Sequence, residues 1–75
     1  MFLSDRSTRA LAARAQARAL DAWRDSARVA SARWVAFLDA EPDARPWAFM
    51  SYVAALDAEE AAAAEMAGLR SLAAA

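Results

Sequence analysis

A single interruption divides a chain whose residues otherwise favour helix along its whole length. The interruption is segment 41–46, which holds both prolines of the sequence. Pro42 has no amide hydrogen and disfavours helical geometry at Glu41, so a preceding helix has to end near this point. Pro46 suits the first turn of a new helix, and the Asp43 carboxylate can cap that helix by accepting a hydrogen bond from a free backbone amide. The segment therefore predicts two helices joined by a short turn.

Alanine indicates that both flanking segments are helical. It accounts for 25 of the 75 residues, and it is the best helix former but is depleted in β-strands. Because the connection is short, the two helices should be antiparallel neighbours. We predict an all-α chain that forms one helical hairpin over residues 1–75, with a first helix over about 5–40, a turn over about 41–45 and a second helix over about 46–67. Alternatively, the second helix continues through Gly68 to about residue 72.

The residue types that are missing exclude most catalytic chemistry. The chain has no cysteine, histidine or lysine and only one glycine. A disulfide framework, a Cys/His metal site, a histidine-based triad, a lysine Schiff base and a glycine-rich phosphate loop are therefore all excluded. The carboxylates of the second helix point in scattered directions. We expect no catalytic residue, no cofactor and no metal, and hence no enzyme.

Apolar positions along both helices predict the hairpin core. When successive residues are placed about 100° apart, the larger apolar residues of each helix fall on one stripe, and those of the first helix alternate at the spacings of three and four that coiled coils use. The opposite side of the first helix carries the charges of a solvated surface. The nine residues predicted to pack between the helices are Leu20, Trp23, Trp34, Phe37, Leu38, Phe49, Tyr52, Val53 and Leu56.

The second helix has a further apolar side, away from this core. A helix that is apolar nearly all round is normally buried on more than one side, whereas a two-helix hairpin covers one side only. We therefore predict a homodimer in the form of a four-helix bundle with the second helix inside. The predicted dimer or partner interface consists of Trp47, Ala54, Ala55, Ala58, Ala62, Met66 and Leu69. Trp47 either packs in this interface or anchors another protein, because tryptophan is enriched at binding hot spots.

One carboxylate falls within the predicted stripe of the second helix. With the turn centred near Asp43, Glu60 lies opposite Ser26, where Arg24 or Arg28 can reach it. We predict an ion pair in the seam that specifies how the two helices align. A functional carboxylate is the alternative.

The tripeptide Leu-Asp-Ala recurs at 20–22, 38–40 and 56–58. The period of 18 residues corresponds to five helical turns. It is shorter than the repeats of the usual repeat families. In a chain so rich in alanine, we interpret the recurrence as coincidence or as a trace of a low-complexity gene.

Charge is distributed unevenly along the chain. Residues 1–33 carry a net charge of +4 and residues 34–75 carry −5. Halves of opposite charge favour contact between the two helices, either within one hairpin or across a dimer. The alternative is that the arginine-rich part of the first helix binds nucleic acid.

These patterns favour a protein-interaction module: an adaptor, an accessory subunit or a small regulator that acts through apolar helix faces. Its expected partners are a second copy and another protein. A small nucleic-acid-associated regulator is the alternative function. A carrier of hydrophobic ligands, with a cavity near Trp23 and Trp34, is a third hypothesis.

No segment is typical of a membrane span or a signal peptide. The longest stretch without a charged residue is 46–56, which is eleven residues, whereas a spanning helix needs about 20. Arginine in place of lysine, together with the absence of isoleucine and asparagine, is typical of a GC-rich bacterial gene. We therefore expect a cytoplasmic bacterial protein.

Overall fold

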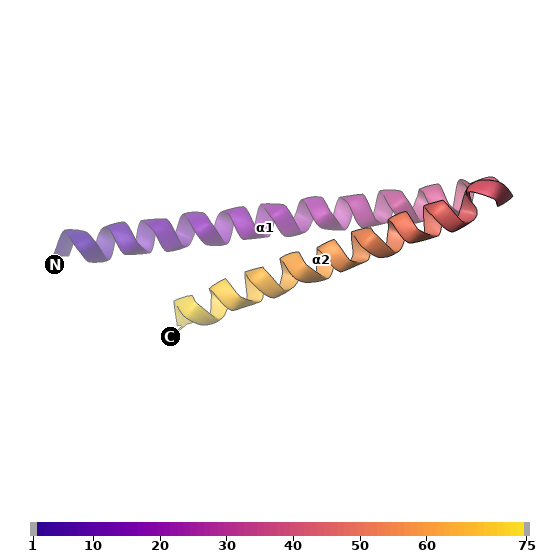
Figure 1. Ribbon diagram of the computed structural model, residues 1–75. Helices are drawn as coiled ribbons and strands as arrows, with labels where there is room; N and C mark the ends of the chain where they lie inside the picture. The colour runs from indigo at the N-terminus through magenta and orange to yellow at the C-terminus, as the bar shows by residue number, and fades with distance from the viewer. Residues whose placement is uncertain (1, 75) are drawn as a thin grey trace.

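The computed structural model describes residues 2–74, which form two long helices packed side by side (Figure 1). Helix α1 spans Phe2–Asp39, a short 3₁₀ turn η1 spans Pro42–Ala44, and helix α2 spans Arg45–Ala74. The chain reverses at η1, so the helices are antiparallel, and this described part contains no strand. Within it, neither helix is both long and apolar enough to cross a membrane. The predicted all-α helical hairpin is confirmed.

Backbone hydrogen bonds close the turn. Glu41 is extended, with φ −61° and ψ 153°, as favoured for a residue that precedes a proline. Its carbonyl oxygen accepts hydrogen bonds from the amides of Ala44 and Arg45, at 2.9 and 3.0 Å. Pro42 begins η1, where its missing amide hydrogen costs nothing. Asp43 lies inside η1 and α2 begins only at Arg45, so the predicted carboxylate cap is replaced by backbone bonds.

Aromatic pairs fix the register of the two helices. The ring centroids of Trp34 and Tyr52 lie 5.0 Å apart, and those of Phe37 and Phe49 lie 5.5 Å apart. The two residue numbers in each facing pair add up to 86, which is the register predicted from the position of the turn. At this register, residues 2–11 of α1 extend beyond the end of α2 (Figure 1).

Alanines occupy the line along which the helices approach most closely. Among the side chains that the structure describes, the buried ones are Ala19, Ala30 and Ala55, with 6%, 4% and 8% of their surface exposed. Small side chains let two helix axes come close together at these points. On α2 the seam positions alternate at spacings of four and three, as in a coiled coil. They are Ala48, Tyr52, Ala55, Glu59, Ala62, Met66 and Leu69.

The observed seam corrects the predicted hairpin core. Four of the nine predicted residues are half-buried, namely Leu20, Trp23, Phe37 and Tyr52. The other five are 37% to 55% exposed, namely Trp34, Leu38, Phe49, Val53 and Leu56. Conversely, four residues predicted for the outer side of α2 lie in the seam, namely Ala55, Ala62, Met66 and Leu69. Because α2 is apolar almost all round, the hydropathy of its residues does not determine which side it turns toward α1.

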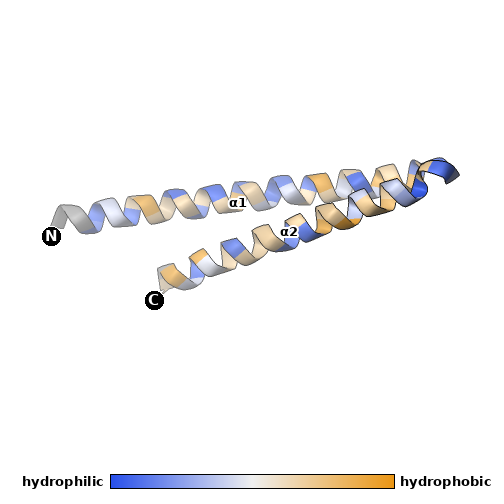
Figure 2. Cartoon of the chain, viewed as in Figure 1, coloured by the Kyte–Doolittle hydropathy of each residue, from blue (hydrophilic) through white to orange (hydrophobic). Residues whose placement is uncertain are grey.

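The hairpin is long and thin. Its extents are 62 × 15 × 12 Å and its radius of gyration is 17.5 Å, whereas a compact domain of this length has a radius of gyration of about 11 Å. Hydrophobic residues occur along both helices, while the turn is hydrophilic (Figure 2). The helices lie closest near the turn and diverge toward the termini (Figure 1). The fold therefore has a seam but no thick core.

Helix α2 continues through Gly68, as in the longer of the two predicted alternatives. Gly68 is exposed, has no positive φ, and has no neighbour within 4 Å of the position that a Cβ atom would occupy. Glycine within a helix costs about 0.5–1 kcal/mol relative to alanine. Gly68→Ala is therefore expected to raise the free energy of unfolding by up to this amount, measured by urea unfolding. Ala64→Gly, at another exposed position of α2, should lower it; equal stability of Gly68→Ala and the wild type would contradict the argument.

Candidate functional site

Seven large apolar side chains lie on one side of the hairpin, which we call the apolar face. Its members are Leu20, Trp34, Val35 and Leu38 from α1 and Phe49, Val53 and Leu56 from α2. Except for the half-buried Leu20, they are 37% to 55% exposed. Helical geometry aligns them, because residues three, four or seven positions apart share one side of a helix. The apolar face therefore contains the five large residues that were predicted to lie in the hairpin core and are exposed in the structure.

A surface groove joins the contributions of the two helices. It has a volume of about 350 Å³ and is lined by Ala30, Ser31, Trp34 and Val35 of α1 and by Tyr52, Leu56 and Glu59 of α2. The ring of Trp34 also lies 5.5 Å from that of Phe37, and such tilted ring pairs are favourable. Trp34 is 41% exposed, so this groove belongs to the molecular surface. It is not the internal cavity that a carrier of hydrophobic ligands needs.

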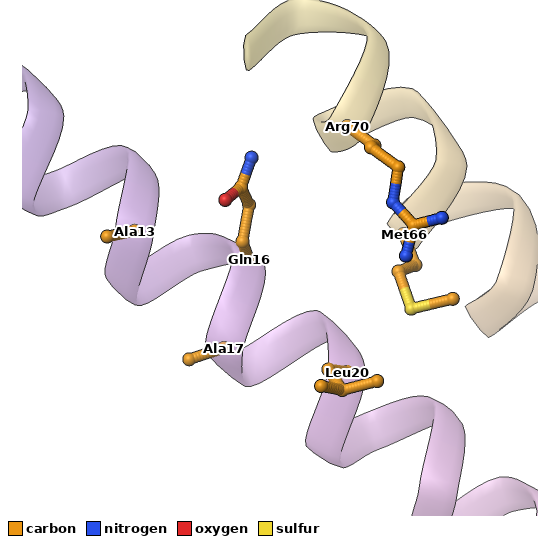
Figure 3. A pocket seen from close by; sticks show the side chains of 6 residues that line it. All are labelled: Ala13, Gln16, Ala17, Leu20, Met66 and Arg70. Carbon is orange, nitrogen blue, oxygen red and sulfur yellow. The ribbon is translucent and has the colours of Figure 1, made fainter. Parts of the chain in front are cut away.

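A second groove continues the apolar face toward the termini. It has a volume of about 340 Å³ and is lined by Ala13, Gln16, Ala17 and Leu20 of α1 and by Met66 and Arg70 of α2. Figure 3 shows Gln16 extending from α1 toward α2, where Met66 and Arg70 lie, with Leu20 further along α1 toward the turn. Here the lining changes from aromatic rings to alanine and polar groups. The part of the apolar face with the largest side chains is therefore the part near the turn.

The recurring Leu-Asp-Ala tripeptides contribute to this same face. Eighteen residues correspond to five helical turns, so Leu20 and Leu38 share one side of α1. Leu56, in the third tripeptide, lines the groove together with Trp34. Each occurrence of the tripeptide thus supplies one leucine to the apolar face.

Trp47 lies on the opposite side of the hairpin. It is 77% exposed, the highest value among the described large apolar side chains. Because it precedes Phe49 by two residues, it points roughly away from the apolar face. Ala54 and Ala58 share its side of α2 and are exposed. Of the predicted interface residues, these three are the ones that remain outside the seam.

The structure also corrects the predicted ion pair in the seam. Glu60 is exposed, and the carboxylate that occupies a half-buried seam position is that of Glu59. Arg28 pairs with Asp25 of its own helix, through side chains that are 73% and 69% exposed. Arg24 is exposed as well. The predicted partners therefore lie at the surface, because α2 turns a different side toward α1 than the one expected.

The outer side of α1 carries a mixture of charges. Arg14, Arg18 and Arg28 are exposed there, with Asp21 and Asp25 between them. Nucleic-acid binding needs a basic patch or stripe, and interspersed carboxylates reduce the attraction for a phosphate backbone. Within residues 2–74, no group of three acidic side chains is placed to hold a metal ion.

No family model, curated protein or solved structure matches the chain. The candidate site therefore rests on the chain's own geometry. It is the apolar face, which is exposed in the single hairpin and has charged side chains along both of its long edges.

Proposed function

We propose that the chain is a non-enzymatic protein-interaction module whose apolar face is covered by a second copy in a four-helix bundle. One observation carries this proposal: six large side chains of the apolar face are 37% to 55% exposed, while the buried side chains among those described are three alanines. Burying a side chain of the size of leucine or phenylalanine stabilises a protein by about 1.5–3 kcal/mol. Association that covers the apolar face supplies burial that one hairpin does not provide.

The accessible surface of the hairpin is large enough for a stable dimer. It amounts to 6003 Å², whereas a compact protein of this mass exposes about 4,500 Å². The excess is about 1,500 Å² per chain, and a standard protein–protein interface buries about 800 Å² per partner. A dimer can therefore bury an ordinary interface and still leave surface for other contacts.

Trp47 supports a role beyond self-association. Trp47 is 77% exposed in the hairpin. In a dimer formed through the apolar face, the side of α2 that carries Trp47 stays at the surface. Large aromatic side chains are frequent anchors in protein interfaces. We propose that another protein binds on this side, which makes the dimer an adaptor or an accessory subunit.

Sedimentation equilibrium tests the dimer. At micromolar concentration we expect a species of twice the chain mass of 8.1 kDa, and a thermal midpoint that rises with protein concentration, because dimerisation stabilises only the folded state. Trp47→Ala should leave the mass unchanged, because Trp47 lies opposite the apolar face. A folded wild-type monomer at every concentration tested would overturn the proposed dimer. Loss of the dimer in Trp47→Ala would instead place the interface on the Trp47 side.

A further inference from the structure

The edge of the apolar face on α1 carries two arginines. Arg24 and Arg28 precede Ser31 and Val35, which line the groove near the turn, by seven residues, or about two helical turns. They therefore lie along this edge, and both are exposed. Asp21 and Asp25 lie further round toward the back of α1 than Arg24 does, and Asp25 pairs with Arg28, so Arg24 is the cation that this edge offers to a partner.

The edge of the apolar face on α2 is acidic. Asp57 and Glu60 follow Val53 by four and seven residues, so they continue its side of the helix and are exposed there. The register of the aromatic pairs places Glu60 within two residues of the height of Arg24 along the hairpin. Within one hairpin these two edges are separated by the whole width of the apolar face.

A symmetric dimer formed face to face has two possible orientations. With the two-fold axis along the hairpin, both turns lie at the same end and α1 of each copy packs against α2 of the other. With the axis across the hairpin, the turns lie at opposite ends and each helix packs against its own copy. The first orientation sets a basic edge against an acidic edge. The second sets basic against basic and acidic against acidic, and such like-charge contacts disfavour association.

The first orientation also matches the distribution of large side chains. It keeps corresponding heights together, so Trp34 and Leu38 near the turn of one copy meet Phe49 and Val53 of the other. The exposed side chains near the turn then cover one another. The second orientation places them against the groove near the termini, whose lining includes Gln16 and Arg70 and no aromatic ring.

We infer that the occupant of the apolar face is a second copy related by a two-fold axis along the hairpin, with Arg24 of each copy paired to Glu60 of the other. This inference rests on the proposed dimer and adds its orientation and its charge pairs. In this dimer the opposite charges of the two helices determine how the two copies are oriented. It also gives Arg24 and Glu60, which do not meet within one hairpin, a contact between copies.

Charge reversal followed by mixing tests the inference. Arg24→Glu and Glu60→Arg each create two like-charge contacts per dimer, and each is expected to raise the dimer dissociation constant about tenfold. An equimolar mixture of the two variants should recover wild-type affinity, because both contacts of the mixed dimer then join unlike charges. Sedimentation velocity gives the affinities, and native mass spectrometry counts the mixed dimers. Arg18→Glu and Glu65→Arg, which change the same charges away from the apolar face, should leave the dimer unchanged.

Each other outcome has a distinct meaning. If Arg24 and Glu60 paired within one hairpin, a chain carrying both Arg24→Glu and Glu60→Arg would recover the wild-type dimer affinity, whereas the mixture of the two single variants would not. The reversed orientation requires that Arg24→Glu binds the wild type more tightly than the wild type binds itself, because the changed edge of α1 then faces an unchanged basic one. Either result would overturn the proposed orientation while leaving the dimer intact, whereas a monomeric wild type would overturn the dimer itself.

Discussion

Aspartate in place of both Leu38 and Leu56 is expected to abolish the dimer. The two leucines are 55% and 39% exposed in the single hairpin, so a second copy that covers the apolar face would bury the part of each that the hairpin leaves exposed. A dimer buries only the part of these four leucines that the hairpin leaves exposed, and full burial of a leucine is worth about 1.5–3 kcal/mol, so the loss is about 3–6 kcal/mol, or roughly 10²- to 10⁴-fold in affinity. The new carboxylates add the cost of burying charge. Sedimentation velocity at micromolar concentration should then report the mass of one chain, 8.1 kDa.

A matched pair of leucines provides the control. Leu11 and Leu72 are 60% and 74% exposed and lie outside the apolar face. Aspartate at both positions introduces the same charges and should leave the dimer intact. If instead the Leu38 and Leu56 variant sediments like the wild type, the apolar face is not the interface.

Leucine in place of Ala55 is expected to destabilise the hairpin itself. Ala55 is 8% exposed and lies at nearly the same height as Ala30, which is 4% exposed, on the line of closest approach. Additional carbon atoms there push the helices apart and weaken the contact between the rings of Trp34 and Tyr52. Overpacking of this kind costs about 1–3 kcal/mol, which corresponds to a fall of about 5–20 °C in thermal midpoint for a chain of this size.

Thermal unfolding followed by circular dichroism measures this effect, with all variants at one concentration because the midpoint of a dimer depends on concentration. Ala54→Leu is the control, since Ala54 is the exposed neighbour of Ala55 on the outer side of α2. We expect this variant to stay within a few degrees of the wild type, since surface substitutions change stability by about 0.5 kcal/mol or less. Equal midpoints for Ala55→Leu and Ala54→Leu would show that the seam tolerates a large side chain.

The hairpin could be predicted because its determinants are local. Pro42 ends one helix, and the short turn brings the second helix back along the first. The same reasoning set the register, since the position of the turn decides which heights face each other. The side that α2 presents to α1 is not local. It depends on how two whole helices pack against each other, and the informative signal was the alternate spacing of four and three from Ala48 through Glu59 to Leu69, which combines small, charged and large apolar residues.

The candidate site was likewise predicted in part: the apolar positions followed from the local sequence, and their surroundings did not. The sequence identified Trp34, Leu38 and Phe49 as apolar positions on one stripe, but it did not reveal what covers them. Arg24 and Glu60 were expected to meet within a hairpin, and the structure places them on opposite edges of one face. The sequence placed the two residues correctly along the length of the hairpin, but not on the correct sides of their helices. Rotating a helix about its axis changes the side that faces its neighbour without changing the register.

The turn also determines the order in which the hairpin forms. Phe37 and Phe49 are 12 residues apart in the chain, whereas Gln16 and Arg70, which line one groove near the termini, are 54 apart. The entropic cost of closing a loop grows with its length, so the first contacts between the helices form at the aromatic pairs beside η1. Each later contact extends a hairpin that is already closed, and such low contact order favours folding in microseconds to milliseconds. The rings beside the turn therefore serve as the starting point of folding as well as the marker of register.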